Sequence, residues 1–245
     1  DIAPLEAVDE LDVSYVSNIS QFGDPDVVII PGSKNTISDL LWMRQNGLEG
    51  KILRHAAKGG IVFGICGGYQ MLGQSISDPT GAEQKGTVRG MGLLPVTTVF
   101  EQEKRRTRVS GRFAKVGGAL AEMSGVCYEG YEIHMGRTVL SKGTVPLVYM
   151  EEEGEQRQDG AQSDHVYGCY MHGIFDMSET VKTFLAAVLR KKGIDPSKIT
   201  VRDRNAYKEE QYDRLAAIVR ENLNMEAVYK IIEKGNEASC SLLSE

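Results

Sequence analysis

Hydrophobic residues occur with two different spacings in the first part of the chain. Residues 26–30 and 60–65 are short apolar runs, typical of strands that are buried on both faces. Between them, residues 38–44 and 48–58 carry apolar side chains at helical spacing. Strand, helix and strand in this order predict a right-handed crossover between parallel strands. Residues 13–16 predict one further short strand.

The middle of the chain, residues 86–155, is richer in β-branched residues, glycine and turn signals. This pattern predicts antiparallel strands, followed by a polar loop over 151–164. The strands are expected at residues 93–100, 109–113, 130–134 and 147–150.

The last part of the chain is predicted to be helical. An apolar stripe from Val181 to Leu189 is followed by Lys191, Lys192 and Gly193, which are typical of a helix end. A final helix is expected from near Tyr207 through Leu223, and residues 225–234 extend or restart it. We therefore expect an α/β fold with a mainly parallel central sheet flanked by helices and an antiparallel β section in the middle. Residues 1–234 are expected to form one domain and residues 235–245 a disordered tail.

Composition excludes several classes of function. The 245 residues are 41% hydrophobic and 25% charged, enough to bury a sizeable core. The net charge of -6 gives no basic surface for nucleic acid, and no stretch approaches the ~20 apolar residues of a membrane span. The four cysteines are scattered without paired spacing, which suits a reducing cytoplasm. We expect a cytoplasmic protein that binds neither nucleic acid nor membranes.

The most informative segment is Gly64-Ile65-Cys66-Gly67-Gly68-Tyr69-Gln70, directly after an apolar strand. A tight strand-to-helix bend of this kind projects its central side chain from the turn, and the flanking glycines tolerate the backbone angles that the bend requires. An isolated cysteine after a strand is more often a core residue than a nucleophile. The glycines and Gln70, one helical turn later, favour Cys66 as a nucleophile.

A cysteine nucleophile needs a base, and the chain has four histidines. His55 lies in an amphipathic helical stretch and His165 in a polar run, where solvated positions are expected. His172 ends an apolar strand, the place where catalytic side chains collect in open α/β sheets, and is the predicted base. Cys169 and His172 are three residues apart and so point to opposite faces of a strand, and we expect no metal site.

Four ordered segments now resemble a known family. Together they resemble the motif set of class I glutamine amidotransferases with a flavodoxin-like fold, in the branch of the cobyric acid synthases, and the resemblance extends to Tyr212–Ala216. The segments are Pro31-Gly32-Ser33-Lys34-Asn35-Thr36, Gly64 to Gly73 around Cys66, Gly130-Tyr131-Glu132-Ile133-His134-Met135-Gly136-Arg137-Thr138, and Tyr170-Met171-His172-Gly173-Ile174-Phe175-Asp176.

The resemblance implies a role for each matched residue. Cys66 would attack the side-chain amide of glutamine, and His172 would transfer the proton. The oxyanion would be stabilised by backbone N–H groups of Gly67 and of Gly32 or Ser33. Glutamine itself would be held by Gln70, with Glu132, His134 and Met135 as further candidates for the same task.

The resemblance also implies a partner. An N-terminal synthetase module, with ATP and Mg²⁺, would activate side-chain carboxylates of a corrinoid acceptor, and this module would supply ammonia. The 245 residues contain no Gly-Xaa4-Gly-Lys-Ser/Thr phosphate loop and begin without Met, so we read the chain as part of a longer polypeptide.

One position departs from the commoner class I pattern. A glutamate two residues after the catalytic histidine orients it there, whereas this chain has Ile174. Asp176, Glu132 or a carboxylate of the synthetase module are the alternatives. Without a third residue, we expect a Cys-His dyad that hydrolyses glutamine slowly in the isolated chain.

Three other functions are considered. The first is the glutaminase module of a related ATP-dependent amide ligase. The second is another cysteine hydrolase of this fold, such as a peptidase or deglycase, which Gln70 and the Pro31–Thr36 segment disfavour. The third is a noncatalytic binding module, which the presence of both Cys66 and His172 disfavours.

Overall fold

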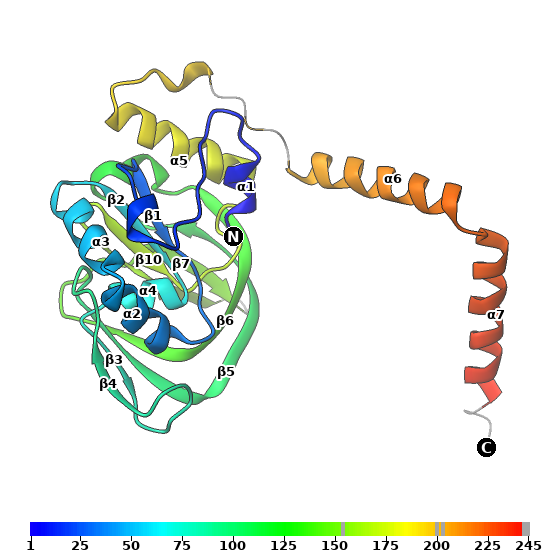
Figure 1. Ribbon diagram of the computed structural model, residues 1–245, viewed down its shortest axis with the longest axis horizontal. Helices are drawn as coiled ribbons and strands as arrows, with labels where there is room; N and C mark the ends of the chain where they lie inside the picture. The colour runs from blue at the N-terminus through cyan, green and yellow to red at the C-terminus, as the bar shows by residue number, and fades with distance from the viewer. Residues whose placement is uncertain (153–154, 199–200, 202–203, 242–245) are drawn as a thin grey trace. The chain divides into compact units, whose positions relative to one another are not determined.

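A computed structural model describes the backbone of residues 1–152, 155–198, 201 and 204–241, and the side chains of these residues except 102–104, 155, 198, 204–208 and 234–241. The chain divides into two compact units, Asp1–Val201 and Arg202–Glu245 (Figure 1). Each unit is described by itself.

The sheet that carries Cys66 has four strands in the order β1-β2-β10-β9. β1 (Val27–Ile30), β2 (Ile61–Ile65) and β10 (Val166–Cys169) are parallel, and β9 (Ala161–Ser163) is antiparallel to β10. The two apolar runs predicted as buried strands are β1 and β2, and every residue of β2 is buried. Because β2 lies between two parallel neighbours, its carboxyl end lies beside the carboxyl ends of β1 and β10.

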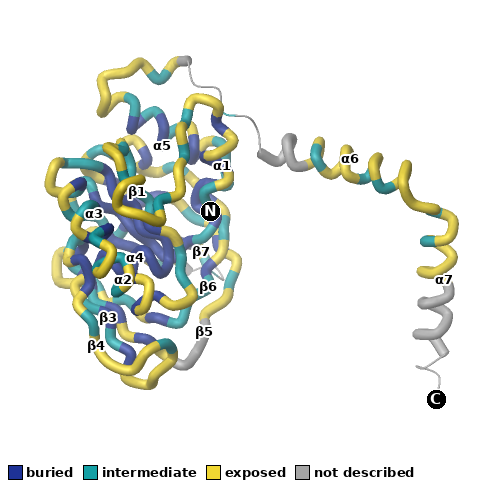
Figure 2. The backbone as a smooth tube through the Cα atoms, viewed as in Figure 1, coloured by how far each residue is buried: buried dark blue, intermediate teal, exposed yellow. Residues whose placement is uncertain are grey.

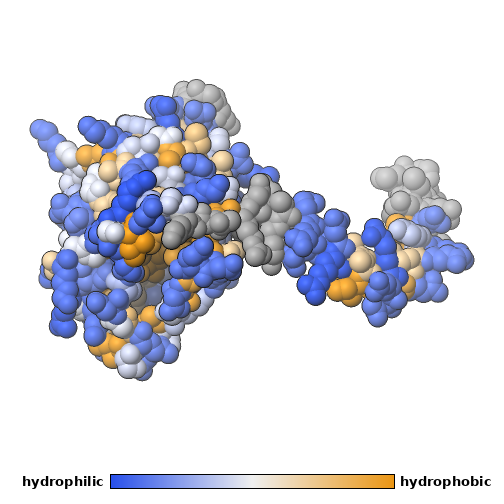
Figure 3. Space-filling model, turned by 90° about the horizontal axis from the view of Figure 1, so that it is seen from above, coloured by the Kyte–Doolittle hydropathy of each residue, from blue (hydrophilic) through white to orange (hydrophobic). Residues whose placement is uncertain are grey.

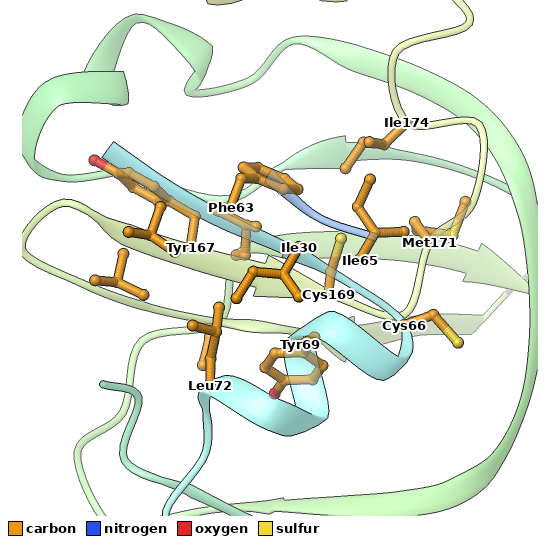
Figure 4. Packing of buried hydrophobic residues seen from close by; sticks show 14 of the residues in the cluster. Ile30, Phe63, Ile65, Cys66, Tyr69, Leu72, Tyr167, Cys169, Met171 and Ile174 are labelled. Carbon is orange, nitrogen blue, oxygen red and sulfur yellow. The ribbon is translucent and has the colours of Figure 1, made fainter. Parts of the chain in front are cut away.

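Helices cover both faces of this sheet (Figure 1). Successive side chains of β2 point to opposite faces, and Gly64 leaves room for Leu72 and Tyr69 of α4 (Gly67–Leu72) on one of them. On the other face, Phe63 contacts Phe175, which contacts Phe184 of α5 (Ser178–Lys191). The two predicted helices of the crossover are α2 (Thr36–Gln45) and α3 (Leu48–Ala57). The aromatic and aliphatic side chains between these layers form the core (Figure 4).

The middle of the chain forms a second sheet, in the order β4-β3-β5-β7-β8 with β6 paired to β5. Antiparallel pairing prevails, as predicted, although β3 and β5 are parallel. An isolated bridge between Tyr131 and His172 joins β6 to the first sheet just beyond β10. The strands are β3 (Ser75–Asp78), β4 (Gly86–Arg89), β5 (Val96–Phe113), β6 (Cys127–Leu140), β7 (Val148–Glu152) and β8 (Glu155–Asp159).

Two local predictions differ from the structure. Among the described residues of the polar segment 151–164, β7 ends and β8 and β9 follow, where we expected a loop. Their sheet partners supply hydrogen bonds that the polar sequence did not indicate. Residues 13–16 belong to no strand, and Val13 packs against the core instead. The remaining short elements are α1 (Ala3–Glu6), η1 (Ile19–Gln21), η2 (Gly118–Met123) and η3 (Pro196–Lys198).

The second unit consists of α6 (Arg204–Asn222) and α7 (Met225–Ser241), so the last predicted helix is present and restarts at Met225. Its described residues are mostly exposed (Figure 2), and Figure 3 shows hydrophobic surface on it. The boundary lies between Val201 and Arg202, whereas we expected one domain over 1–234. The expected tail lies partly in α7, and residues 242–245 lie outside the described residues.

Within the described part of the chain, no helix is both long enough and apolar enough to cross a bilayer.

Candidate active site

Cys66 occupies a strained bend between β2 and α4. Its backbone angles are φ 51° and ψ -108°, a region that residues with a side chain rarely adopt. The residue is 6% exposed, and its sulfur points away from the packed side chains of the sheet (Figure 4). The thiol donates to the backbone carbonyl of Ile133 in β6, with Sγ 3.6 Å from that oxygen. Cys66 therefore lies at the edge of the core, facing β6.

The glycines around Cys66 are required by close backbone contacts. A Cβ on Gly68 would lie 2.0 Å from the carbonyl oxygen of Ile30 at the end of β1. A Cβ on Gly64 would lie 2.7 Å from the backbone nitrogen of Tyr69. No side chain fits at either distance, so the bend packs directly on its neighbours. Gly64, Gly67 and Gly68 do not have positive φ angles, so close contact requires these glycines, whereas we expected unusual backbone angles to require them.

The predicted oxyanion-binding segments meet at this bend. A Cβ on Gly67 would lie 2.8 Å from the backbone nitrogen of Ser33, so the main chains of Gly67 and Ser33 are adjacent. The Ser33 hydroxyl donates to Asp39 and accepts from the backbone N–H of Asn35 at 2.9 Å, which fixes the turn after β1. Both segments follow parallel strands of one sheet, and this explains why they come together.

His172 lies next to the same bend. The position that a Cβ on Gly32 would take is 3.6 Å from Cβ of Cys66 and 3.6 Å from Nε2 of His172. The structure thus brings together Cys66, His172 and the turn of Gly32 and Ser33. The imidazole lies directly over Gly32, which is possible only because this residue has no side chain, since a Cβ there would be 2.9 Å from Cε1 of His172.

Tyr131 and Asp1 hold His172 in place. The His172 main chain exchanges two hydrogen bonds with that of Tyr131 of β6, at 2.9 and 3.1 Å, and the two side-chain rings stack with centroids 5.1 Å apart. Nδ1 lies 2.8 Å from Oδ2 of Asp1, and Oδ1 of the same carboxylate accepts from the backbone N–H of Gly173 at 2.8 Å. Nδ1 is therefore occupied by a carboxylate, and the opposite edge of the ring lies at Gly32, with Cε1 2.9 Å and Nε2 3.6 Å from the position of a Cβ there.

Gln70, a predicted substrate-binding residue, is buried behind Cys66. Its Nε2 donates to the hydroxyl of Tyr170 at 3.1 Å, and this hydroxyl also pairs with Thr138 at 2.6 Å. Burial raises the pKa of Tyr170, so the hydroxyl stays neutral and serves as both donor and acceptor. The ring of His134 stacks on Tyr170 with centroids 3.7 Å apart.

Glu132 is fully buried in an ion-pair cluster beside the site. Its Oε2 lies 3.0 Å from Nε of Arg105 and 2.5 Å from Nη2 of Arg157, and its Oε1 lies 3.7 Å from Nε2 of His134. Burial alone would raise the pKa of Glu132, but His134 and Arg157 outweigh it and lower the pKa to about 2. Glu132 is therefore a carboxylate enclosed by cations.

Asp159, next to this cluster, behaves in the opposite way. Burial, and then the charge of Glu132, raise its pKa to about 6, although its carboxylate accepts from the backbone N–H of Tyr170 at 2.8 Å.

The predicted substrate-binding residues of β6 lie on two faces of the strand, because successive side chains alternate. Glu132 and His134 face this cluster, whereas Met135, which is half-buried, lies on the face that Tyr131 occupies.

Sequence reasoning missed Asp1, Tyr131, Tyr170 and Asp159. Asp1 is 171 positions from His172, and no motif links the two. Tyr131 and Tyr170 lie inside the motifs that carry the family resemblance. Their aromatic rings, close in sequence to Glu132 and His172, could have indicated that they contact the site. Among the described residues, no group of three or more His, Cys, Asp or Glu side chains is placed to hold a metal ion.

Comparisons with known proteins agree with this architecture. The family model of the CobB/CobQ-like glutamine amidotransferase domain matches residues 1–180. The cobyric acid synthase of Ruminiclostridium cellulolyticum is 50% identical over 241 residues, which cover 97% of this chain and 47% of that protein. The cobyric acid synthase of Lachnoclostridium phytofermentans is 42% identical over 245 residues, covering 96% of this chain and 48% of that protein. The chain thus spans about half the length of these curated relatives.

Two solved structures share the fold. A crystal structure of a glutamine amidotransferase aligns with a TM-score of 0.53 at 16% identity, over 79% of this chain and 90% of that one. The structure of PurLQS from Thermotoga maritima aligns with a TM-score of 0.53 at 18% identity, over 73% of this chain and 85% of that one. The predicted α/β fold of class I glutamine amidotransferases is confirmed. By its sequence match over residues 1–180, the chain belongs to the CobB/CobQ-like glutamine amidotransferase family.

Proposed function

We propose that this domain hydrolyses glutamine through a thioester on Cys66 and supplies the ammonia for an ATP-dependent amidation. The observation that carries the proposal is the convergence on Gly32: Cβ of Cys66 and Nε2 of His172 each lie 3.6 Å from one point beside it. A thiol, an imidazole and two adjacent main-chain segments are the groups that cleavage of an unstrained carboxamide requires.

The reaction would proceed in two halves. Nε2 of His172 takes the thiol proton, and Sγ of Cys66 attacks the carboxamide carbon of glutamine. The backbone N–H of Gly67 and that of Gly32 or Ser33 stabilise the oxyanion. Collapse of this intermediate breaks the C–N bond, and His172 returns its proton to the leaving nitrogen, which departs as ammonia. Water, deprotonated by His172, then attacks the thioester and releases glutamate and the thiol.

The predicted substrate-binding residues divide into two groups in this proposal. Met135 shares a face of β6 with Tyr131, whose ring stacks on His172, and Gln70 lies directly behind the bend. Met135 is the residue we assign to the amino-acid head of glutamine, whereas Gln70, whose amide donates to Tyr170, belongs with the supporting residues. Glu132 and His134 are tied to Arg157 and Tyr170, which favours a supporting role for them.

The ammonia acceptor belongs to the other half of the protein. Relatives at 50% and 42% identity are cobyric acid synthases of about twice this length. By analogy with them, an N-terminal synthetase module would bind ATP and Mg²⁺ and activate the side-chain carboxylates of a corrinoid. A cytoplasmic location is part of the same proposal. The alternatives, a related amide ligase or another cysteine hydrolase, share the Cys66 chemistry and differ in substrate.

The test is covalent labelling by a diazo-ketone glutamine mimic, followed by mass spectrometry. One adduct on Cys66 is expected, together with ammonia release from glutamine. Cys66→Ala should abolish the adduct and lower ammonia release by more than about 10³-fold, because the nucleophile is lost. Cys127→Ala is the matched control, since Cys127 is exposed and stands on β6 away from the bend. Two results would favour the hydrolase alternative. One is a folded protein in which the glutamine mimic leaves Cys66 unlabelled, and the other is labelling of Cys66 by peptide electrophiles as fast as by the glutamine mimic.

A further inference from the structure

The geometry points to Asp1 as the positioning residue of His172, the carboxylate that the family's commoner pattern places two residues after the histidine. In this chain that position is Ile174, which is fully buried among apolar side chains. The carboxylate of Asp1, the first residue of the sequence, contacts the imidazole instead. The inference rests on the proposed glutaminase function and assigns to it a third residue.

Both carboxylate oxygens of Asp1 are engaged on the same segment. Oδ2 lies 2.8 Å from Nδ1 of His172, and Oδ1 accepts from the N–H of Gly173 at 2.8 Å. The contact is sheltered, since the Asp1 side chain is 14% exposed and that of His172 is 12% exposed. Charge-assisted hydrogen bonds of this kind are stronger than neutral ones and fix orientation as well as distance.

The contact determines which nitrogen of the imidazole faces the nucleophile. A carboxylate accepts hydrogen bonds only, so Nδ1 carries the proton when it pairs with Asp1. The lone pair of the neutral ring then lies on Nε2, on the side of Gly32 and Cys66. The anion also stabilises the imidazolium that forms when His172 takes the thiol proton.

The other carboxylates considered are placed differently. Glu132 is committed to Arg105 and Arg157. The Asp176 carboxylate lies beside Gly173, with Oδ2 3.2 Å from the position of a Cβ there, and its backbone N–H closes the turn onto the Gly173 carbonyl at 2.8 Å. Asp1 thus supplies the carboxylate that is in hydrogen-bond contact with Nδ1. The contact is made by side-chain oxygens, so a residue bonded to the Asp1 nitrogen would not remove either acceptor.

The test compares Asp1→Ala, Asp1→Asn and Asp1→Glu with Asp12→Asn, which removes the same charge from an exposed residue of the same segment. Asp1→Ala is expected to lower kcat for glutamine hydrolysis by on the order of 10²- to 10⁴-fold with little change in KM. The pH profile of kcat should move towards lower pH, because the imidazolium loses its counter-charge. Asp1→Asn should resemble Asp1→Ala, Asp1→Glu should recover part of the rate, and added formate should partly rescue Asp1→Ala alone.

A second measurement is independent of turnover. NMR of ¹⁵N-labelled histidine in the wild type should show a protonated Nδ1 on neutral His172, and Asp1→Ala should lose this preference. If the wild type is active and labelled at Cys66 while Asp1→Ala keeps its kcat within about threefold and its pH profile, the positioning role is wrong and the glutaminase function stands. A wild type that is neither active nor labelled at Cys66 overturns both.

Discussion

At the Cys66 bend, main-chain atoms of three segments touch one another, whereas on the neighbouring strand β6 charged side chains are buried against each other. The bend requires glycine at positions 64, 67 and 68, because neighbouring atoms leave too little room there for a Cβ. The β6 region depends on Glu132 and its partners Arg105 and Arg157.

The two regions tolerate change differently for this reason. Steric contact in the bend falls off within a few tenths of an ångström and does not depend on pH. Charge pairing on β6 acts over several ångströms and changes with protonation. The candidate site thus combines a rigid bend, whose packing does not depend on pH, with a neighbouring cluster of charges that does.

The largest effect is expected from Gly68→Ala. A Cβ here would lie 2.0 Å from the Ile30 carbonyl oxygen, so β1 and α4 must separate, and we expect the free energy of unfolding to fall by about 3 kcal/mol or more. Glutamine hydrolysis should fall with it. Gly50→Ala in α3 is the matched control, because a Cβ there meets nothing within 4 Å and should stabilise the helix by about 0.5–1 kcal/mol. Chemical denaturation measures both, and equal stabilities would contradict the steric account of the bend.

A somewhat smaller effect is expected from Glu132→Gln. The change leaves Arg105 and Arg157 without their buried counter-charge, and we expect a loss of about 3 kcal/mol at pH 7. Because the folded pKa of Glu132 is lowered to about 2, its contribution is present above the ordinary value of 4.5 and is lost as the pH falls from there towards 2. Glu129→Gln, an exposed position on the same strand, should change stability by less than about 0.5 kcal/mol. A difference between wild type and Glu132→Gln that does not shrink below pH 4 would exclude the ion-pair explanation.

The smallest effect, of opposite sign, is expected from Asp159→Asn. Folding raises the pKa of Asp159 from 3.8 to about 6, so the folded state favours the protonated form and the wild type loses stability as the pH rises from about 4 to about 6. Asp159→Asn cannot ionise, and its stability relative to the wild type should therefore increase over this interval, by on the order of 1–3 kcal/mol. Thermal unfolding at several pH values measures this, with Asp12→Asn as the exposed control. If the stability of Asp159→Asn relative to the wild type stays constant with pH, folding does not raise the pKa of Asp159.

Most of the first sheet could be predicted from the sequence. The apolar runs of β1 and β2, and the glycines around Cys66, are local patterns whose physical meaning does not depend on distant residues. The choice of His172 over the other histidines also followed from a local feature, the end of an apolar strand. The structure places it beside Cys66 and Gly32.

The errors lie where pairing between distant segments decides the outcome. Residues 151–164 have a polar sequence typical of a loop, yet β8 and β9 form in them because β7 and β10 offer hydrogen-bond partners. Glu132 and His134 alternate like residues of a solvated strand, yet Arg157 from β8 and Tyr170 beyond β10 enclose them. The polar character of a residue does not tell whether a partner will cover it.

The glycine-flanked bend at Cys66, the position of His172 after an apolar strand and the family resemblance could be predicted from the sequence, because each depends on short runs of neighbouring residues. The contacts of Asp1 with His172 and of Glu132 with Arg157 depend on the tertiary fold, since they join residues 171 and 25 positions apart. Backbone geometry is set by adjacent residues, whereas the pairing of a charge is set by whichever segment the fold brings within hydrogen-bond distance.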